Sequence, residues 1–377
     1  MQPDLGDAEL LRIKEVFKSN WLGRGSVVAD FEFKFANNLN APQENFYAMS
    51  CCTEGLFLAA EVFGFSADDE IIVPTISFIA AGSAVVKSGA SLVLCDVDPR
   101  TLNATVETIA AKYTSKTKAV ILNHYGGYPC DLSPILQFAK AHDILVIEDS
   151  ACAVQSFYKG QACGTFGDMG VWSFDAMKTL VTGDGGMIYL RTQEHLDHVK
   201  EECYLGLPSR GASGIDKVEE GSDIWWEVQI NRPGRRAIMN NISAAIGLSQ
   251  LERLQGFIDR RKVITAMYNN AFRDLDWLQG PPEELKDTVS SYYFYWIQTA
   301  KRNELATYLK ENGVYTSFRY WPLNWVDYFN FGKATQFEHS DYAANHTLNL
   351  PLHHSLSDSD VLSVIDLILT FYKGKGL

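Results

Sequence analysis

Two side chains stand near the ends of apolar runs and could carry out chemistry on a bound small molecule. Asp149 ends the run 146–149, and Lys178 follows the run 171–174 shortly before Gly183–Gly186. A lysine amine becomes a nucleophile when desolvation or a nearby positive charge lowers its pKa, and it then forms a Schiff base with an aldehyde. A carboxylate at a strand end can keep a ring nitrogen protonated, which makes the ring an electron sink. Taken singly, Asp149 is equally a turn or helix cap, and Lys178 is usually a solvated surface group.

Short apolar runs with β-branched residues alternate with stretches of helical period, such as residues 78–87 and 132–141. Such runs are typical of strands buried on both faces, and the alternation predicts a mostly parallel sheet with right-handed crossovers. The last two runs are joined by a short Gly-rich link, which favours an antiparallel pair. Ligands of open α/β sheets bind at the carboxyl ends of strands, where Asp149 and Lys178 lie. The runs are residues 71–73, 92–94, 119–122, 144–147, 171–174 and 187–190.

The pattern changes after residue 241. Apolar residues from Ile242 to about Asp274 follow one stripe of a long helix, Gly280-Pro281-Pro282 interrupts the chain, and residues 292–299 are typical of a strand. A chain of 377 residues suggests about two domains. We therefore expect a large domain at residues 1–250 and a small C-terminal domain at 251–377, connected by the long helix.

Composition excludes several classes of protein. The net charge of −13 and the pI near 5.1 argue against nucleic acid or an anionic membrane as a partner, because phosphate backbones require a basic face. The chain has no run of about 18 uncharged apolar residues, the length a membrane span needs. Acidic residues interrupt residues 1–20, unlike a secretion signal, so we expect a cytoplasmic protein. Seven irregularly spaced cysteines predict reduced thiols, with no disulfide framework and no metal site.

Residues 173–186 resemble the SFxxxK…GEGG signature of the DegT/DnrJ/StrS-type sugar aminotransferases. Further segments resemble that family in the same order along nearly the whole chain, which makes the resemblance very specific. These segments are residues 21–25 with 31–32, 50–54, 69–74 with 77–78, 95–98, 124–129, 147–151, 244–248 and 350–353.

The resemblance implies the fold and the reaction. It implies the pyridoxal-phosphate-dependent fold type I: a large domain with a mixed, mostly parallel seven-stranded sheet, and a smaller C-terminal α/β domain. It also implies a homodimer with the active site at the interface. The amino donor would be L-glutamate and the acceptor a keto sugar, nucleotide-linked in the main hypothesis. The product would serve the synthesis of a polysaccharide, a lipopolysaccharide or a glycosylated metabolite.

The same resemblance implies a role for individual residues. Lys178 would carry pyridoxal 5′-phosphate as a Schiff base and then shuttle a proton. Asp149 would pair with the ring nitrogen, and Phe78 would stack on the ring unless it is a core residue. The cofactor phosphate would meet Thr53, the backbone N–H groups of Thr53 and Glu54, and the Ser173 hydroxyl at a helix N-terminus. His124 is either a residue of the substrate pocket or a hydrogen-bonded core histidine.

The chain departs from the family pattern at several positions. Cys52 replaces a glycine of the phosphate loop, so the backbone there must avoid a left-handed conformation or tolerate strain. Cys152 replaces the glutamine or histidine that contacts the phenolic oxygen of the cofactor. Arg236 replaces an asparagine that reaches the cofactor phosphate of the partner subunit, and a guanidinium can bind phosphate in the same way. The alternative for Arg236 is an exposed surface arginine.

Arg319 stands in place of a histidine, in a segment that otherwise resembles the family. An arginine there could hold an anionic substrate group such as a diphosphate or a carboxylate. The arginine changes indicate a strongly anionic acceptor, so Arg319→Ala should raise the KM of the acceptor and spare the half-reaction with glutamate. Trp225 and Trp226, in the unusual segment 223–227, would stack a base, cover a sugar face or pack in the core.

There are four alternatives to this function. Within the same reaction class, the acceptor could be a non-nucleotide sugar acid or another anionic carbonyl compound. Related sugar dehydratases carry a histidine at the Schiff-base position, which argues against that activity here. A regulatory protein that binds pyridoxal phosphate without turnover is a further alternative. A plain nucleotide-binding module is disfavoured because no GxGxxG follows the first strand.

Overall fold

The computed structural model describes residues 3–207, 230–330 and 337–374. Its centre is a seven-stranded sheet in the order β1-β9-β8-β5-β4-β2-β3. The pairs of β2 with β3 and β4, of β4 with β5 and of β5 with β8 are parallel, whereas β9 runs antiparallel to β8 and β1. The strands are β1 (Phe46–Met49), β2 (Glu70–Pro74), β3 (Ser91–Cys95), β4 (Thr117–Asn123), β5 (Leu145–Asp149), β8 (Met169–Ser173) and β9 (Gly186–Leu190).

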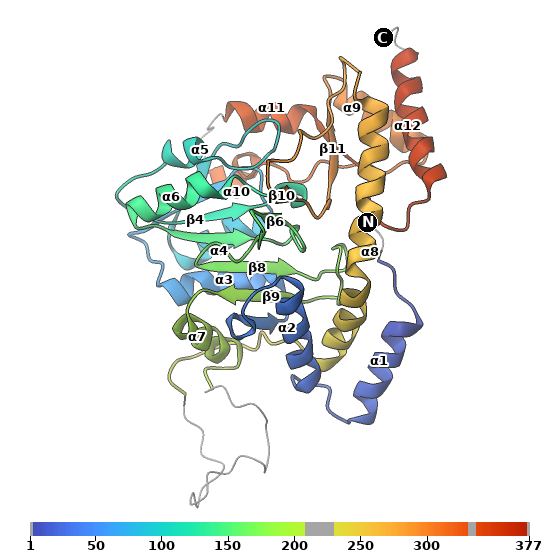
Figure 1. Cartoon of the computed structure of the whole chain (residues 1–377). Coiled ribbons are helices and arrows are strands. Elements are labelled where there is room, and N and C mark those ends of the chain that lie inside the picture. The colour runs from blue at the N-terminus through green and yellow to red at the C-terminus, as the bar shows by residue number, and fades with distance from the viewer. Residues whose placement is uncertain (1–2, 208–229, 331–336, 375–377) are drawn as a thin grey trace, which may run out of the picture.

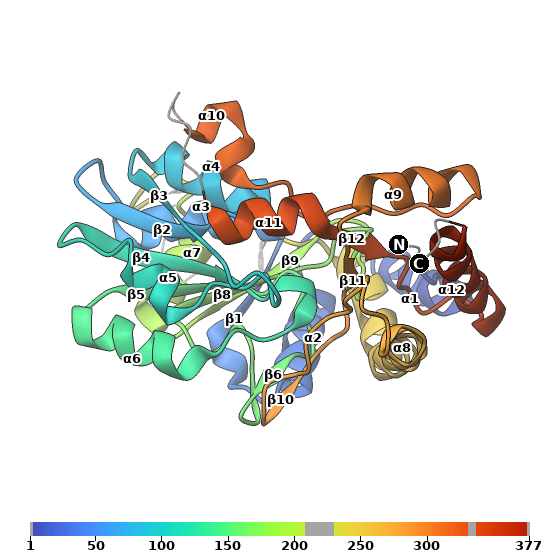
Figure 2. The same cartoon turned by 90° about the horizontal axis from the view of Figure 1, so that it is seen from above.

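Successive residues of a strand point to opposite faces of the sheet, so an apolar run makes both faces apolar. Helices cover both faces of this sheet. Ile71 and Val73 pack under one set of helices, and Ile72 packs under the other. Figure 2 shows α4 and α6 on opposite sides of the strands. The first set is α3 (Cys52–Phe63), α4 (Ile79–Ser88) and α7 (Gln193–Cys203); the second is α5 (Val106–Ala110) and α6 (Leu132–His142).

One long helix, α8 (Asn241–Phe272), joins the sheet to the C-terminal part of the chain (Figure 1). It begins where the Asn240 side chain caps the Ser243 amide at 2.9 Å. Its apolar side chains pack against α2 and α12 in one continuous core. The remaining helices and strands named below or drawn in Figure 1 are α1 (Asp7–Lys18), α2 (Ser26–Asn38), β11 (Tyr295–Gln298), α9 (Arg302–Glu311), α10 (Asp327–Asn330), α11 (Glu338–His346), β12 (Thr347–Leu350) and α12 (Asp358–Lys373).

Two small sheets tie the C-terminal part together and to the large sheet region. The first has the order β10-β6-β7 and joins β10 (Thr288–Val289) to β6 (Phe157–Tyr158) and β7 (Gln161–Ala162). The second is the antiparallel pair of β11 and β12. Beside them the buried Arg261 of α8 donates hydrogen bonds to the carbonyls of Tyr292, Tyr293 and Leu352 at 3.2–3.3 Å. These contacts fix the segment that carries Tyr293, which lines the cavity described below.

The architecture confirms the expected fold class. The six apolar runs form β2, β3, β4, β5, β8 and β9, and the last two are antiparallel as predicted. The boundary expected between residues 250 and 251 falls inside α8, so the helix belongs to both parts and the division stays a prediction. Trp225 and Trp226 lie outside the described residues.

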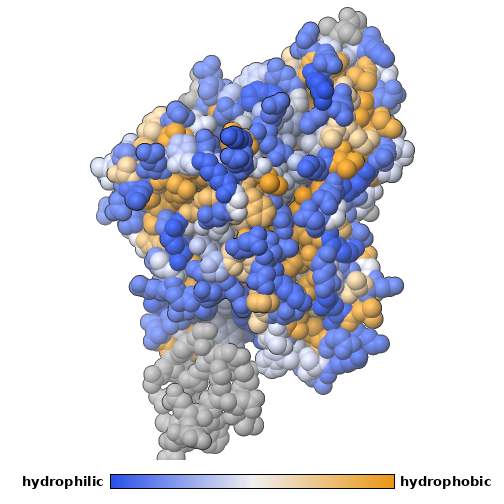
Figure 3. Space-filling model, in the orientation of Figure 1, coloured by the Kyte–Doolittle hydropathy of each residue, from blue (hydrophilic) through white to orange (hydrophobic). Residues whose placement is uncertain are grey.

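The surface mixes polar and apolar side chains on the face shown in Figure 3. Among the residues that the structure describes, no helix is long and apolar enough to cross a membrane.

Candidate active site

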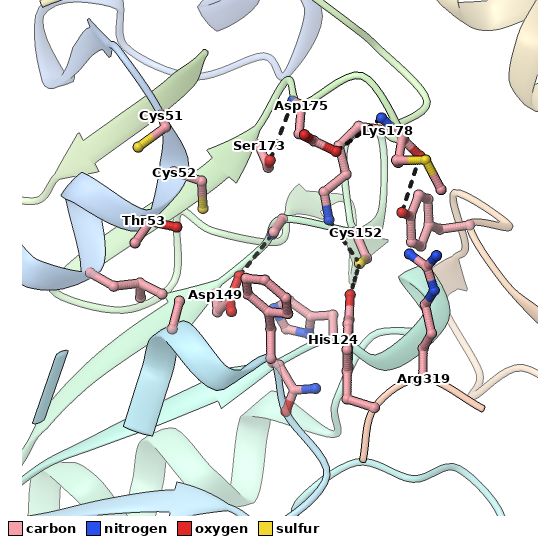
Figure 4. Close-up of a pocket in the computed structure, with 18 of the residues that line it drawn as sticks. Cys51, Cys52, Thr53, His124, Asp149, Cys152, Ser173, Asp175, Lys178 and Arg319 are labelled. Atoms are coloured by element: carbon pink, nitrogen blue, oxygen red, sulfur yellow. Dashed lines mark hydrogen bonds between the residues drawn. The ribbon is translucent and has the colours of Figure 1, made fainter. Parts of the chain in front are cut away.

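A cavity of about 330 Å³ opens at the carboxyl ends of the parallel strands (Figure 4). This volume is at the lower end of the roughly 300–1,000 Å³ usual for small-molecule sites. The cavity brings together predicted residues from separate segments of the chain: Thr53, Phe78, His124, Asp149, Ser173, Lys178 and Arg319. It has two sides, a strand-end wall (Thr53, Asp149, Ser173 and Lys178) and a C-terminal wall (Tyr293, Arg319 and Tyr320).

Asp149 is the last residue of β5 and is 6% exposed. One carboxylate oxygen accepts the Ala151 amide at 3.1 Å. Burial raises the pKa of Asp149, and the hydrogen bond from the Ala151 amide and the charge of Lys178 oppose that shift. A buried carboxylate of this kind needs a protonated partner, which a ring N–H of a bound ligand would supply.

Lys178 lies in the loop that joins β8 to β9, and its Nζ contacts the Cys152 Sγ at 3.6 Å. The same ammonium lies 5.0 Å from the centroid of the Tyr293 ring. Burial acts to lower the pKa of Lys178, but Cys152, Tyr293 and Asp149 together raise it above its ordinary value. This corrects the expectation of a lowered pKa: the neighbours that act on the amine are acidic groups and not the cation that would lower it.

The N-terminus of α3 forms the end of the cavity beside Thr53. The helix starts after Cys51, whose side chain makes no capping hydrogen bond, so the first-turn N–H groups are available to an anion. The backbone at Cys52 is helical, and no left-handed conformation is needed there. A Cβ on Gly186 would lie 2.5 Å from the Cys52 nitrogen. Gly186 therefore lets β9 approach this loop closely.

His124 is buried with 1% exposure and has both ring nitrogens engaged. Nδ1 accepts the Cys130 amide at 3.1 Å, and Nε2 lies 3.1 Å from Glu148 Oε2. A nitrogen that accepts a backbone N–H is unprotonated, so the ring is neutral and Nε2–H donates to Glu148. His124 lines the cavity but has no ring nitrogen left for a substrate, which favours the core-histidine alternative.

The C-terminal wall is made by side chains that follow α8 in the chain. The Tyr320 hydroxyl lies 3.4 Å from the Cys152 Sγ, and its ring lies 5.5 Å from the ring of Phe78. Phe78 is 47% exposed at the start of α4, so it is not a core residue. The Tyr293 hydroxyl donates to the Met177 carbonyl at 3.2 Å, beside Lys178. This wall therefore contacts the lysine loop directly.

Two predicted residues do not reach this cavity with their side chains. Glu54 is paired with Arg235 at 2.7 Å, so only its backbone N–H remains for a phosphate. Arg236 lines a separate cleft with Trp21 and Arg24, and its guanidinium lies 5.4 Å from the centroid of the Tyr204 ring. A contact of Arg236 with a partner subunit stays a prediction.

The sequence interpretation missed Tyr293 and Asn123 and did not assign a role to Tyr320. Asn123 ends β4 beside Asp149, so the strand-end rule that selected Asp149 could also have selected it. Its Oδ1 has no hydrogen-bond partner within the described part of the chain. Tyr293 and Tyr320 carry no comparable local signal, because only the packing of the C-terminal part brings them here.

The residues present fit pyridoxal phosphate. An amine, a buried carboxylate and an uncapped helix N-terminus face one cavity, and these match the aldehyde, the ring nitrogen and the phosphate of that cofactor. The Thr53 and Ser173 side chains line the cavity too and offer hydroxyl donors to the phosphate.

Comparison with known proteins agrees with this geometry. Residues 3–369 match the DegT/DnrJ/EryC1/StrS aminotransferase family. A dTDP-4-dehydro-2,3,6-trideoxy-D-glucose 4-aminotransferase of Saccharopolyspora spinosa is 43% identical over 367 residues, which cover 97% of this chain and 94% of the relative. The crystal structure of the aminotransferase TlmJ from Streptoalloteichus hindustanus has a TM-score of 0.93 at 44% identity, covering 100% of this chain and 99% of that one.

A sugar aminotransferase structure from Streptococcus pneumoniae, described as putative and as the PLP form, has a TM-score of 0.85 at 25% identity. It covers 97% of this chain and 96% of that one. The fold type I architecture and the pyridoxal phosphate dependence expected from the sequence are thereby confirmed. The chain belongs to the DegT/DnrJ/EryC1/StrS aminotransferase family, and it is a pyridoxal-phosphate-dependent transaminase.

Proposed function

We propose that this enzyme moves the amino group of L-glutamate to a ketone carbon of a sugar carried on a nucleoside diphosphate. The observation that carries the proposal is the shared cavity of Lys178 and Asp149, which opens toward the C-terminal wall. The relative from Saccharopolyspora spinosa acts on a dTDP-linked keto sugar and is similar along nearly the whole chain. This relationship supports a nucleotide-linked acceptor over a free sugar acid.

The cofactor and the protein divide the chemistry. Bound pyridoxal phosphate supplies an electron sink that stabilises negative charge on the carbon bearing the amino nitrogen. Asp149 would keep the ring nitrogen protonated, because a carboxylate buried at the end of β5 favours a proton on its partner. The first turn of α3, with Thr53, and the Ser173 hydroxyl would hold the phosphate.

Lys178 would hold the cofactor and then move the proton at the reacting carbon. Its Nζ contacts the Cys152 Sγ at 3.6 Å, and burial raises the pKa of that thiol. The neighbours that raise the Lys178 pKa favour the ammonium in the absence of cofactor, so cofactor attachment should accelerate as pH rises. Tyr293 and Tyr320 line the cavity beside Lys178 and would help to exclude water from the proton transfer.

We also propose a homodimer, in which Arg236 reaches the cofactor phosphate of the second subunit. Several apolar side chains that line the Arg236 cleft or belong to α1, which precedes it in the chain, are exposed in the single chain. Leu10, Leu11 and Phe17 of α1 are 56–63% exposed, and Trp21 and Leu22 are 47–48% exposed. Burial of this surface against a second copy would remove it from water and thereby stabilise the assembly.

The remaining alternatives concern the acceptor and turnover. A sugar acid stays an alternative because Arg319 would bind its carboxylate. A binding-only regulatory role is disfavoured by the presence of Lys178 and Asp149 in one cavity. A cytoplasmic location and a place in polysaccharide, lipopolysaccharide or glycosylated-metabolite synthesis stay predictions.

The test is the formation of an amino sugar. Purified enzyme loaded with pyridoxal phosphate is incubated with L-glutamate and a dTDP-4-keto sugar, and the products are measured by mass spectrometry. We expect equal amounts of 2-oxoglutarate and amino sugar. Turnover with a free keto sugar acid but not with the nucleotide sugar would replace the proposed acceptor. Absence of 2-oxoglutarate with every acceptor would reject glutamate as donor.

A further inference from the structure

Arg319 places a positive charge on the C-terminal wall of the cavity. Its backbone amide donates to the Asn349 Oδ1 at 2.7 Å. Within residues 3–207, 230–330 and 337–374, its guanidinium has neither a carboxylate nor a carbonyl partner. A cation that lines a ligand cavity and has no partner in the protein is positioned to bind an anionic ligand group.

The backbone around Arg319 is held in place by contacts with the buried Asn349 of β12. Asn349 is 5% exposed and donates its Nδ2 to the Tyr125 hydroxyl at 3.1 Å. The main chain of Ser317 forms a bridge with Asn349 that extends the pair of β11 and β12. Arg319 therefore starts from a fixed point, which lowers the entropy lost when the side chain binds a ligand.

The other charged groups of the cavity already have partners. An Asp175 carboxylate oxygen accepts the Met177 amide at 2.9 Å, and an Asp184 oxygen accepts the Gly185 amide at 3.0 Å. Asp149 faces the expected ring nitrogen, and the Lys178 amine takes part in the reaction. Among the described residues that line the cavity, Arg319 is thus the cation left for a substrate.

Arg319 lies on the side of the cavity that holds the Lys178 amine. It does not lie on the side of Thr53, where the cofactor phosphate is expected. Arg319 and Lys178 both exert their charge on Tyr293, and the next residue, Tyr320, contacts the thiol that contacts Lys178. Figure 4 shows Arg319 on the same side of the cavity as Cys152 and Lys178, opposite Cys51, Cys52 and Thr53. Its ligand group is therefore expected on the Lys178 side of the cavity, near the carbon on which Lys178 acts.

The two substrates differ in where they carry negative charge. An amino-acid donor has its α-carboxylate one bond from the reacting carbon. A nucleotide-linked keto sugar carries its diphosphate beyond the sugar ring, several bonds from the ketone. Resting on the proposed function, we infer that Arg319 binds the α-carboxylate of the amino-acid donor and selects α-amino acids over simple amines.

The first experiment measures the donor half-reaction alone. Enzyme loaded with pyridoxal phosphate is mixed with L-glutamate or with 4-aminobutyrate, which lacks the α-carboxylate, and the decay of the visible cofactor band is followed. For Arg319→Ala we expect the efficiency with L-glutamate to fall about 100-fold, as for a truncated charge pair. The rate with 4-aminobutyrate should change less than about twofold. The kcat/KM of Arg319→Ala for the keto sugar, which accepts the amino group in the second half-reaction, should also be retained.

Two further variants keep the result interpretable. Arg319→Lys retains the charge but loses the planar fork, so it should recover part of the L-glutamate efficiency. Arg273→Ala is the matched control, because Arg273 is exposed at the end of α8, outside the cavity, and donates to the Asn270 side chain at 2.9 Å. It should behave as the unmodified enzyme.

A binding measurement provides a readout independent of turnover. Calorimetric titration of the loaded enzyme with glutarate, a dicarboxylate without an amine, should show about tenfold weaker binding to Arg319→Ala. Unchanged L-glutamate kinetics and glutarate binding would overturn the inference. A raised KM for the keto sugar alone would also overturn it and assign Arg319 to the acceptor. Failure of the unmodified enzyme to form the visible band would instead reject the proposed function.

Discussion

The two walls of the cavity are built in different ways. The strand-end wall takes Asp149, Ser173 and Lys178 from the ends of neighbouring strands and the loop that follows, so strand order places them together. The C-terminal wall takes Tyr293, Arg319 and Tyr320 from segments that reach the cavity only because the C-terminal part packs against the sheet. One wall follows from local sequence and topology, and the other from long-range packing.

This difference separates the residues that hold the cofactor from those that select the substrate. The strand-end wall carries the groups that fit the cofactor, and these are the residues that resemble the family. The C-terminal wall carries Arg319, whose guanidinium has no carboxylate or carbonyl partner among the residues that the structure describes, and it contacts the lysine through Tyr320 and Cys152. Changes in the first wall should therefore affect every substrate, and changes in the second should affect substrates unequally.

The largest effect among the predictions that follow is expected at Asp149. Asp149→Asn should reduce transamination about 100-fold with every donor, because it removes one partner of a buried charge pair with the cofactor ring. Steady-state kinetics with two donors test this expectation. A loss confined to one donor would contradict the division between the walls.

The same variant should have the opposite effect on the stability of the cofactor-free protein. Burial raises the pKa of Asp149 in the folded state above its unfolded value. The folded state then binds this proton more tightly, so the contribution of Asp149 to stability is present at acidic pH and is lost as pH rises through the folded pKa. At pH 7 Asp149 is left with the cost of a buried negative charge, and the neutral amide side chain of the Asp149→Asn variant removes that cost. Thermal unfolding without cofactor should show an equal or higher midpoint for the variant.

A second prediction concerns the close approach of β9 to the N-terminus of α3, where the cofactor phosphate is expected to bind. Gly186→Ala would place a Cβ 2.5 Å from the Cys52 nitrogen. The shift this forces should lower the free energy of unfolding by about 1–3 kcal/mol. It should also weaken cofactor binding, measured by titration of the visible band. Gly256→Ala is the control, because its Cβ would meet nothing within 4 Å on α8, and it should stabilise the protein.

The smallest effect is expected at the contact between the walls. Tyr320→Phe removes the hydroxyl that lies 3.4 Å from the Cys152 Sγ. Loss of one hydrogen bond should reduce kcat/KM about fivefold, and the cofactor should still bind. Tyr315→Phe, at a residue that is 75% exposed, should leave the kinetics unchanged. Equal losses in both variants would show that the Tyr320 contact has no specific role.

Much of the strand-end wall can be predicted from the sequence. Continuous apolar runs identify β2, β3, β4, β5, β8 and β9, and the polar residues at their ends lead to Asp149 and Lys178. The first strand of the sheet, β1, is not identified in this way, because its four residues between polar neighbours resemble many short apolar stretches. The expected bounds of the long helix agree with α8 to within two residues at each end, since its apolar stripe continues along the whole helix.

The rest depends on tertiary contacts. No local pattern shows that Tyr293 would lie beside Lys178, because the hydrogen bonds of Arg261 from α8 hold that segment in place. The raised pKa of Lys178 likewise arises from Cys152, Tyr293 and Asp149, which are far apart in sequence. The sequence thus predicts which residue is functional more readily than it predicts the groups that surround that residue.

The most direct test of the central claim is the visible spectrum of the protein with pyridoxal phosphate, before and after addition of L-glutamate. We expect a cofactor band that L-glutamate discharges, that is absent in Lys178→Ala, and that persists in Lys140→Ala, a control at an exposed lysine of α6. A band that Lys178→Ala retains in full would contradict the assignment of Lys178 as the residue that holds the cofactor.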